Sequence, residues 1–263
     1  MKLIKEIFKY RELLKNNVKK EVRGRYKNSI LGVMWTFLNP LLQIAVYAMI
    51  FPYILKQQQP YYLIFVCVGL IPWSFFTTTI IQSTNTIIGN ANIVKKVYFP
   101  REILPLSVVL SGAINFLIAT IIILAFCIGG GKGITWHIII FPIILLLQMI
   151  LQLAISFVLS AVTVYIRDIE HFVQIVLMLM FYATPIVYST ATLDGSTTTA
   201  RFMKQVIMLN PMTTIIEGYR SIFYTQTLPN FKGIGIWYII SISLLFIGWL
   251  IFKKLQKGFA EEL

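Results

Sequence analysis

Acidic residues, histidines and cysteines are scarce in this 263-residue chain. It contains ten Asp and Glu, two His and two Cys. Cys67 and Cys127 lie in apolar runs without Cys-x-x-Cys or Cys/His spacing, so neither a disulfide framework nor a zinc site is supported. We therefore expect no metal site and no catalytic residues.

Charge of either sign is also sparse, since charged residues make up 13% of the chain and hydrophobic residues 57%. In an average soluble domain, charged residues make up about 25% of the chain and hydrophobic residues about 45–50%. This composition favours lipid as the solvent and predicts an all-α integral membrane protein with a single domain, 1–263. Six spans are expected, at 31–55, 61–81, 103–128, 136–166, 172–188 and 234–252.

The N-terminal segment 1–28 is basic and amphipathic. Residues 1–27 carry ten cations and three acids, and apolar residues recur among them at spacings of three or four. A solvated basic tail would need no such stripe. The pattern therefore predicts a helix lying in the membrane interface.

The placement of the cations predicts the topology. Six spans put both ends on one side, and that side receives seventeen of the 23 Lys and Arg, while the other receives six. By the positive-inside rule, both termini are cytoplasmic. The net charge of +13 is thus read as a topology signal, and no nucleic-acid partner is expected.

Two segments between the spans stand out. The basic, amphipathic stretch 85–101 predicts a short helix standing off the membrane, although a connector with snorkelling lysines is an alternative. Segment 205–224 is split by Asn210-Pro211, which predicts two short helices that dip into the outer side and return. Within it, Glu217 and Arg220 are spaced to pair on one helix face. The alternative is a functional role for the pair, either in gating or in contact with an anionic group of a substrate.

Motifs for ATP binding and membrane catalysis are missing from the sequence. No P-loop is present, because Gly129-Gly130-Gly131-Lys132 lacks the required spacing, so energy from ATP has to come from a partner. No nucleophile elbow or His-Glu-x-x-His occurs either. Arg167 and Asp168 form an inner-surface cluster with their neighbours, read as a helix-terminal ion pair or, alternatively, as a contact for an anionic substrate group.

Aromatic residues are plentiful, at 14% of the chain. Flat aromatic faces offer weak, sliding contacts, so some of these residues are candidates to line a channel. The candidates are Phe75, Phe76, Tyr182 and Tyr188. The alternative is interfacial anchoring and lipid contact, which is ordinary in membrane proteins.

Four strings in order resemble one family, the type-2 ABC exporter permeases that move O-antigen and teichoic acid. They are RYKNSILGVMW at 25–35 with Pro40 beyond it, KVYFPRE at 96–102, YIRDI at 165–169, and TPIVY at 184–188 with Asn210-Pro211 downstream. Together they extend over most of the chain.

This resemblance implies a homodimer, with each chain docked to a separate nucleotide-binding subunit that holds ATP and Mg. It also implies a lipid-linked polysaccharide as cargo and the inner membrane of a bacterium as the location. The chain itself would need no cofactor. The implied site residues are Arg25, Tyr26 and Trp35 in a gate helix, Asn92, Lys95, Lys96, Tyr98, Pro100 and Arg101 in an ATPase-coupling helix, and Asn210, Pro211, Glu217 and Arg220 in an outer gate.

Three other functions remain open from the sequence. One is a type-2 ABC exporter of drugs or small lipids, and another is a membrane-embedded lipid-linked sugar transferase. The third is an ATP-independent channel or scaffold, which would not need residues 92–101 to bind an ATPase.

Overall fold

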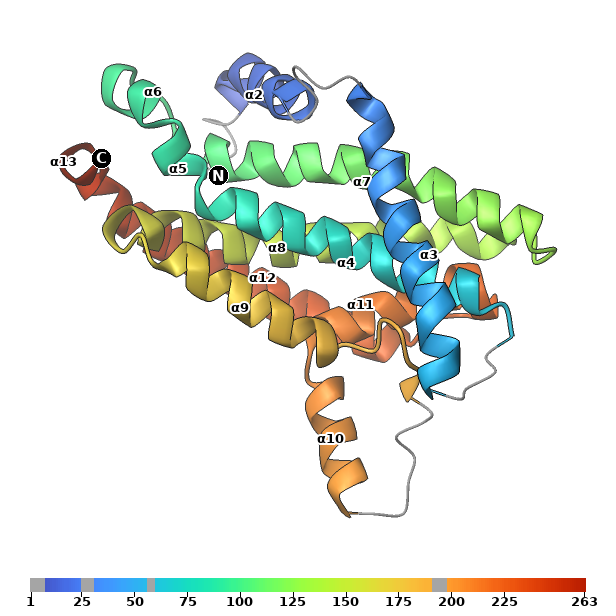
Figure 1. The fold of residues 1–263 in the computed structure, drawn as a ribbon. Helices are drawn as coiled ribbons and strands as arrows, with labels where there is room; N and C mark the ends of the chain where they lie inside the picture. Colours follow the sequence, from blue (N-terminus) through green and yellow to red (C-terminus); the bar gives the residue numbers. More distant parts are fainter. Residues whose placement is uncertain (1–7, 25–30, 56–59, 191–197) are drawn as a thin grey trace.

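The computed structural model describes residues 8–24, 31–55, 60–190 and 198–263, and all regular secondary structure in these ranges is helical (Figure 1). Five of the described helices are long and apolar enough to cross a membrane. They are α3 (Trp35–Leu55), α4 (Tyr62–Thr84), α7 (Ile103–Gly129), α8 (Phe141–Tyr165, preceded by the helical turn η2 at Trp136–Ile140) and α12 (Phe231–Leu255). The predicted all-α membrane fold is confirmed.

Helix α4 forms the centre of the bundle and packs against α3, α7, α8 and α11 (Pro211–Arg220). Of the residues in its apolar, membrane-length stretch, 78% are buried, whereas the corresponding fraction is 6% for α3 and 17% for α12. The outer helices thus keep large apolar side chains exposed, including Leu42, Val46 and Met49 of α3. Such faces suit lipid or a second chain.

The fifth predicted span, 172–188, is not one continuous helix. The apolar helix α9 (Ile169–Tyr182) has 14 residues, or about 21 Å at 1.5 Å per residue, which is short of a hydrocarbon core about 30 Å thick. The chain then runs through a buried, non-helical stretch, Thr184–Val187. Pro185 explains the stop, because proline disfavours helical geometry at the preceding residue and cannot donate to the helix.

The predicted helix over 85–101 is shorter and divided. It comprises α5 (Thr86–Gly89) and α6 (Ala91–Lys96), after which Val97 adopts an extended conformation and the chain continues without helix to Pro100. The N-terminal amphipathic segment contains α2 (Arg11–Gly24), which has no buried residues and packs on α7.

The break at Asn210-Pro211 is confirmed, since α10 (Thr198–Met208) ends just before it and α11 begins at Pro211. Helix α11 is embedded in the bundle, with Met212, Ile215 and Tyr219 fully buried, and a π-helical turn, η4 (Ser221–Thr225), extends it. A return within the bilayer stays a prediction.

Helices α2, α6 and α13 (Phe259–Glu262, after the turn η5 at Gln256–Gly258) gather at one end of the bundle, here called the α6 end (Figure 1). Contacts agree, because α13 packs on α6 and Lys20 of α2 donates to the Asn90 side chain at 3.0 Å. Segments near the two ends of the chain thus share one end of the bundle, as the predicted topology requires.

Candidate functional site

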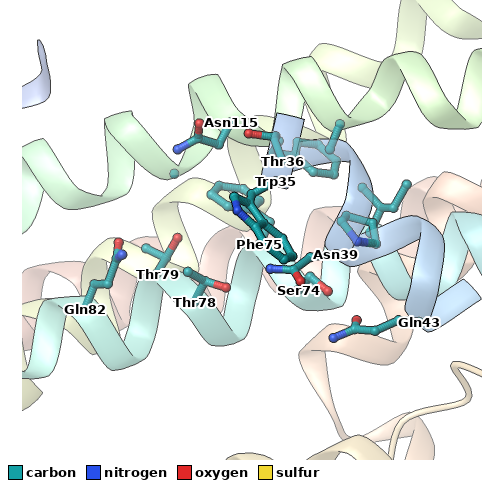
Figure 2. Close-up of a pocket in the computed structure, with 15 residues that line it drawn as sticks. Trp35, Thr36, Asn39, Gln43, Ser74, Phe75, Thr78, Thr79, Gln82 and Asn115 are labelled. Carbon is teal, nitrogen blue, oxygen red and sulfur yellow. The ribbon is translucent and has the colours of Figure 1, made fainter. Parts of the chain in front are cut away.

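A polar groove of about 410 Å³ lies between α3, α4 and α7 (Figure 2). Three aromatic residues line it, Trp35, Phe75 and Phe116. The side chains able to hydrogen-bond there are the amides Asn39, Gln43, Gln82 and Asn115 and the hydroxyls Thr36, Ser74, Thr78 and Thr79. None of the described residues in this lining is charged.

The shape of the groove depends on a close approach of α4 and α7. A Cβ at Gly112 of α7 would overlap Thr79 Oγ1 and lie 2.9 Å from the Phe75 ring, so glycine is needed there. Thr79 is fully buried, and its hydroxyl finds no hydrogen-bond partner among the described residues. A buried hydroxyl without a partner is costly, and the Thr79 hydroxyl is enclosed at the contact with Gly112.

Aromatic faces beside neutral amides and hydroxyls suit a sugar. Amides can both donate to and accept from hydroxyl groups, and flat rings contact the apolar faces of pyranoses. A phosphate would find no cation among the described residues that line this groove. The lining therefore favours the glycan part of a substrate over its anionic part.

Of the four predicted channel residues, only Phe75 lines the groove. Phe76 is buried and packs on Trp73, with ring centroids 5.6 Å apart. Tyr182 is 64% exposed at the end of α9, and the Tyr188 hydroxyl donates to its carbonyl oxygen at 3.0 Å. Trp35, predicted as a gate residue, does reach the groove.

The sequence reasoning missed the amides. Asn39, Gln43, Gln82 and Asn115 lie in otherwise apolar helices, and polar side chains within spans are a functional signal. That signal could have identified them.

At the α6 end, most of the predicted coupling residues are accessible. The exposed ones are Asn92, Lys95, Lys96 and Tyr98. Tyr98 is 94% exposed, whereas its neighbour Phe99 is 5% exposed. Phe99 packs in an apolar cluster, here the α6-end cluster, formed by Ile87, Val94, Phe99, Leu104, Phe157, Ala161, Val164, Phe252 and Phe259. This cluster ties the coupling segment to α8, α12 and α13.

Arg101 differs from the other predicted coupling residues because its guanidinium faces the protein. It donates to the Gln256 carbonyl oxygen and lies 5.6 Å from the centre of the Phe259 ring. Pro100 beside it is half-buried. These contacts indicate that Arg101 fixes the segment to the C-terminal turn.

The structure provides little evidence on two further groups of predicted site residues. Arg25 and Tyr26 lie outside the described residues. Arg167 and Asp168 are exposed in the turn between α8 and α9, and they form no ion pair in the described ranges. The two interpretations of this cluster, a helix-terminal ion pair and a contact for the substrate, stay predictions.

At the opposite end, the predicted pair Glu217–Arg220 is confirmed, with Arg220 Nη1 3.0 Å from Glu217 Oε1. Arg220 is 2% exposed, its Nη2 donates to the Ile186 carbonyl oxygen at 2.7 Å, and its guanidinium carbon lies 3.6 Å from the Phe65 ring centre. Gly69 permits this arrangement, because a Cβ there would lie 2.8 Å from the Ile186 oxygen. Arg220 thus joins α11, α4 and the non-helical stretch after α9.

Asn210 makes a second link between α11 and α9. Its side-chain oxygen caps α11 by accepting from the Met212 amide at 3.0 Å, and its Nδ2 donates to Thr184 Oγ1 at 2.7 Å. The Thr184 hydroxyl in turn donates to the Met180 carbonyl oxygen at 2.6 Å. The start of α11 is therefore tied to the last turn of α9.

We expect Asn210→Ala to lower the free energy of unfolding by about 1–2 kcal/mol, because it removes a helix cap and a second hydrogen bond. Thermal unfolding in detergent would measure the loss. Asn230→Ala is the matched control, since Asn230 also caps a helix through the Gly233 amide but lies exposed at the start of α12. An equal loss in both variants would contradict a linking role for Asn210.

This arrangement of long apolar helices around a polar groove, with an exposed basic segment at one end, defines a multi-pass membrane protein of the transporter class. Residues 12–224 match the family model for the ABC-2 type transporter. The chain is also 35% identical, over the full length of both chains, to the "O-antigen export system permease protein RfbA" of Myxococcus xanthus. A protein of the same name from Klebsiella pneumoniae is 36% identical over 246 residues, which cover 93% of this chain and 92% of that protein.

The chain belongs to the ABC-2 type transporter family. It is the permease type of subunit, a transporter component rather than a catalytic enzyme.

Proposed function

We propose that this chain is the membrane-spanning subunit of an ATP-driven exporter that moves a lipid-linked polysaccharide across the inner membrane of a bacterium. Two copies form the channel, and two separate ATPase subunits, which bind ATP and Mg, dock on the cytoplasmic side. The names of the full-length relatives support the polysaccharide as cargo. Both termini lie in the cytoplasm, in keeping with the distribution of cations.

The observation that carries the choice of cargo is the uncharged groove lined by rings, amides and hydroxyls. A sugar transferase would need an acidic residue or histidine near its substrate, and the part of the groove lining that the structure describes has neither. The substrates of a drug or small-lipid exporter are more apolar and would form fewer hydrogen bonds with the four amides of the groove. The groove therefore favours a glycan that slides past several weak contacts.

The coupling segment supports a partner that supplies energy. Its exposed Lys95, Lys96 and Tyr98 can contact an ATPase, and the α6-end cluster behind them can pass a displacement to α8 and α12. ATP can shift the permease between two arrangements only if the ATPase binds one of them more tightly. In this mechanism the ATPase moves α6, and the α6-end cluster passes that movement to the helices around the groove.

Affinity copurification in mild detergent tests this proposal. We expect a P-loop ATPase to copurify with the tagged wild-type chain and to be lost from Lys95→Glu/Lys96→Glu, because charge reversal on the exposed face opposes docking. Surface polysaccharide would fall in parallel. Lys254→Glu is the control, since Lys254 is an exposed lysine on α12, outside the coupling segment.

The proposal fails if no ATPase copurifies, even after crosslinking in native membranes. It also fails if the double variant exports normally while its ATPase is absent.

A further inference from the structure

A second cavity, of about 480 Å³, lies at the α6 end and is distinct from the polar groove. Three segments that are far apart in the sequence form it: Lys9 and Tyr10 before α2, the stretch Val97–Glu102, and Lys253, Gln256 and Lys257 at the end of α12. We refer to it as the α6-end pocket.

The lining of the α6-end pocket is strongly basic. Its described residues include Lys9, Arg101, Lys253 and Lys257, and the one acid among them is Glu102, which is 4% exposed. Arg101 is engaged in the wall by Gln256 and Phe259, as described above. The three lysines are exposed and form no ion pair with any described carboxylate.

The end of the apolar run of α12 indicates the depth of this pocket relative to the membrane. Lys253 lies in the last turn of α12, directly after that run, and its Nζ lies 4.8 Å from the centre of the Trp249 ring, which packs on the α6-end cluster. A lysine at the end of a span extends its ammonium group out of the apolar layer to the level of the lipid headgroups. The pocket therefore opens at headgroup depth, and the exposed Val97 offers an apolar edge beside it.

Lysine ammonium groups are compact point charges that bind phosphate well. Basic pockets between helices on the cytoplasmic side of membrane proteins also bind anionic lipid headgroups. A carboxylate of a partner protein could meet the same cations, but the headgroup-level position favours a lipid.

We propose that the α6-end pocket binds the phosphate-bearing headgroup of an anionic lipid in the adjoining leaflet. Two lipids offer this chemistry, namely a bulk phospholipid and the polyprenyl diphosphate carrier of the cargo. The second source rests on the proposed function, whereas the first does not. In either case the headgroup bridges the N-terminal segment, the coupling segment and the end of α12.

The test uses the full-length chain in phosphatidylcholine nanodiscs that contain a small fraction of either phosphatidylglycerol or a polyprenyl diphosphate. Native mass spectrometry measures retention of the added lipid. We expect Lys253→Gln/Lys257→Gln to weaken binding about 25-fold, because each juxtamembrane cation contributes roughly a factor of five. The control is Lys95→Gln/Lys254→Gln, which removes two exposed lysines outside the pocket.

A selective loss of phosphatidylglycerol assigns the pocket to bulk phospholipid, and a selective loss of the diphosphate assigns it to the carrier; both support the proposal. An equal loss in the control shows general surface attraction and overturns it. Unchanged binding of both lipids also overturns it. If the pocket variant keeps both lipids but loses a copurifying ATPase, the pocket is a protein contact. The Lys95→Glu/Lys96→Glu experiment tests the proposed function separately. If that experiment fails, a selective loss of phosphatidylglycerol would still support lipid binding in the α6-end pocket.

Discussion

Replacing Arg220 by alanine should destabilise the protein and stop export. The substitution leaves the Ile186 carbonyl oxygen without its donor, unpairs Glu217, and opens a cavity over the Phe65 ring. Removing one partner of a buried ion pair costs about 3–5 kcal/mol. We expect the lower end of that range, because the Glu217 side chain is 39% exposed and can still reach solvent.

Thermal unfolding in detergent and surface polysaccharide in cells would measure the two effects. Arg220→Lys separates charge from geometry, since lysine keeps the charge but cannot reproduce the two-pronged contact with Glu217 and Ile186. We expect it to recover part of the stability and little of the export. Normal stability together with normal export in Arg220→Ala would exclude a role for this residue at the outer gate.

Gly248→Ala should loosen the packing of α12 on α8. An added Cβ would lie 2.7 Å from the Ala154 carbonyl oxygen, which is backbone and cannot turn aside. Small residues allow helices in membranes to approach closely, and overpacking such a contact costs about 1–3 kcal/mol. Because α12 also supplies Phe252 to the α6-end cluster, displacement of this helix should reduce ATP-dependent export as well.

The same helix contains a matched control. A Cβ at Gly235 would meet nothing within 4 Å, so Gly235→Ala should be neutral or slightly stabilising through its better helix propensity. The comparison isolates packing from propensity. Equal melting temperatures for the two variants would show that α12 does not depend on the close contact at Gly248.

Much of the helical framework could be predicted from the sequence because long apolar runs have few alternatives in a membrane. The predicted spans 103–128 and 136–166 differ by a residue at one end from Ile103–Gly129 and Trp136–Tyr165. The fifth span was predicted too long because hydropathy continued through Pro185, whereas the backbone restriction at that proline ended the helix.

The sites were less predictable because they depend on contacts between residues that are distant in the sequence. The Glu217–Arg220 pair is local and followed from helical spacing, but the Ile186 oxygen that completes the Arg220 site lies 34 residues away. Arg101 was predicted to face an ATPase, and its acceptor on Gln256, 155 residues away, gave no sequence signal. The amides of the polar groove converge only because α3 packs on α4 and α7.

The two native thiols have a practical consequence. Cys67 is 0% exposed and Cys127 is 1% exposed, and both sulfur atoms are enclosed by the bundle. Water-soluble maleimides would reach neither thiol in the folded chain, so the wild-type background already suits site-directed labelling. A single cysteine introduced in place of exposed Tyr98 could carry a fluorophore or spin label without first removing the native thiols. Distances measured between two such labels in an assembled transporter would then follow the movement of α6 through the ATP cycle.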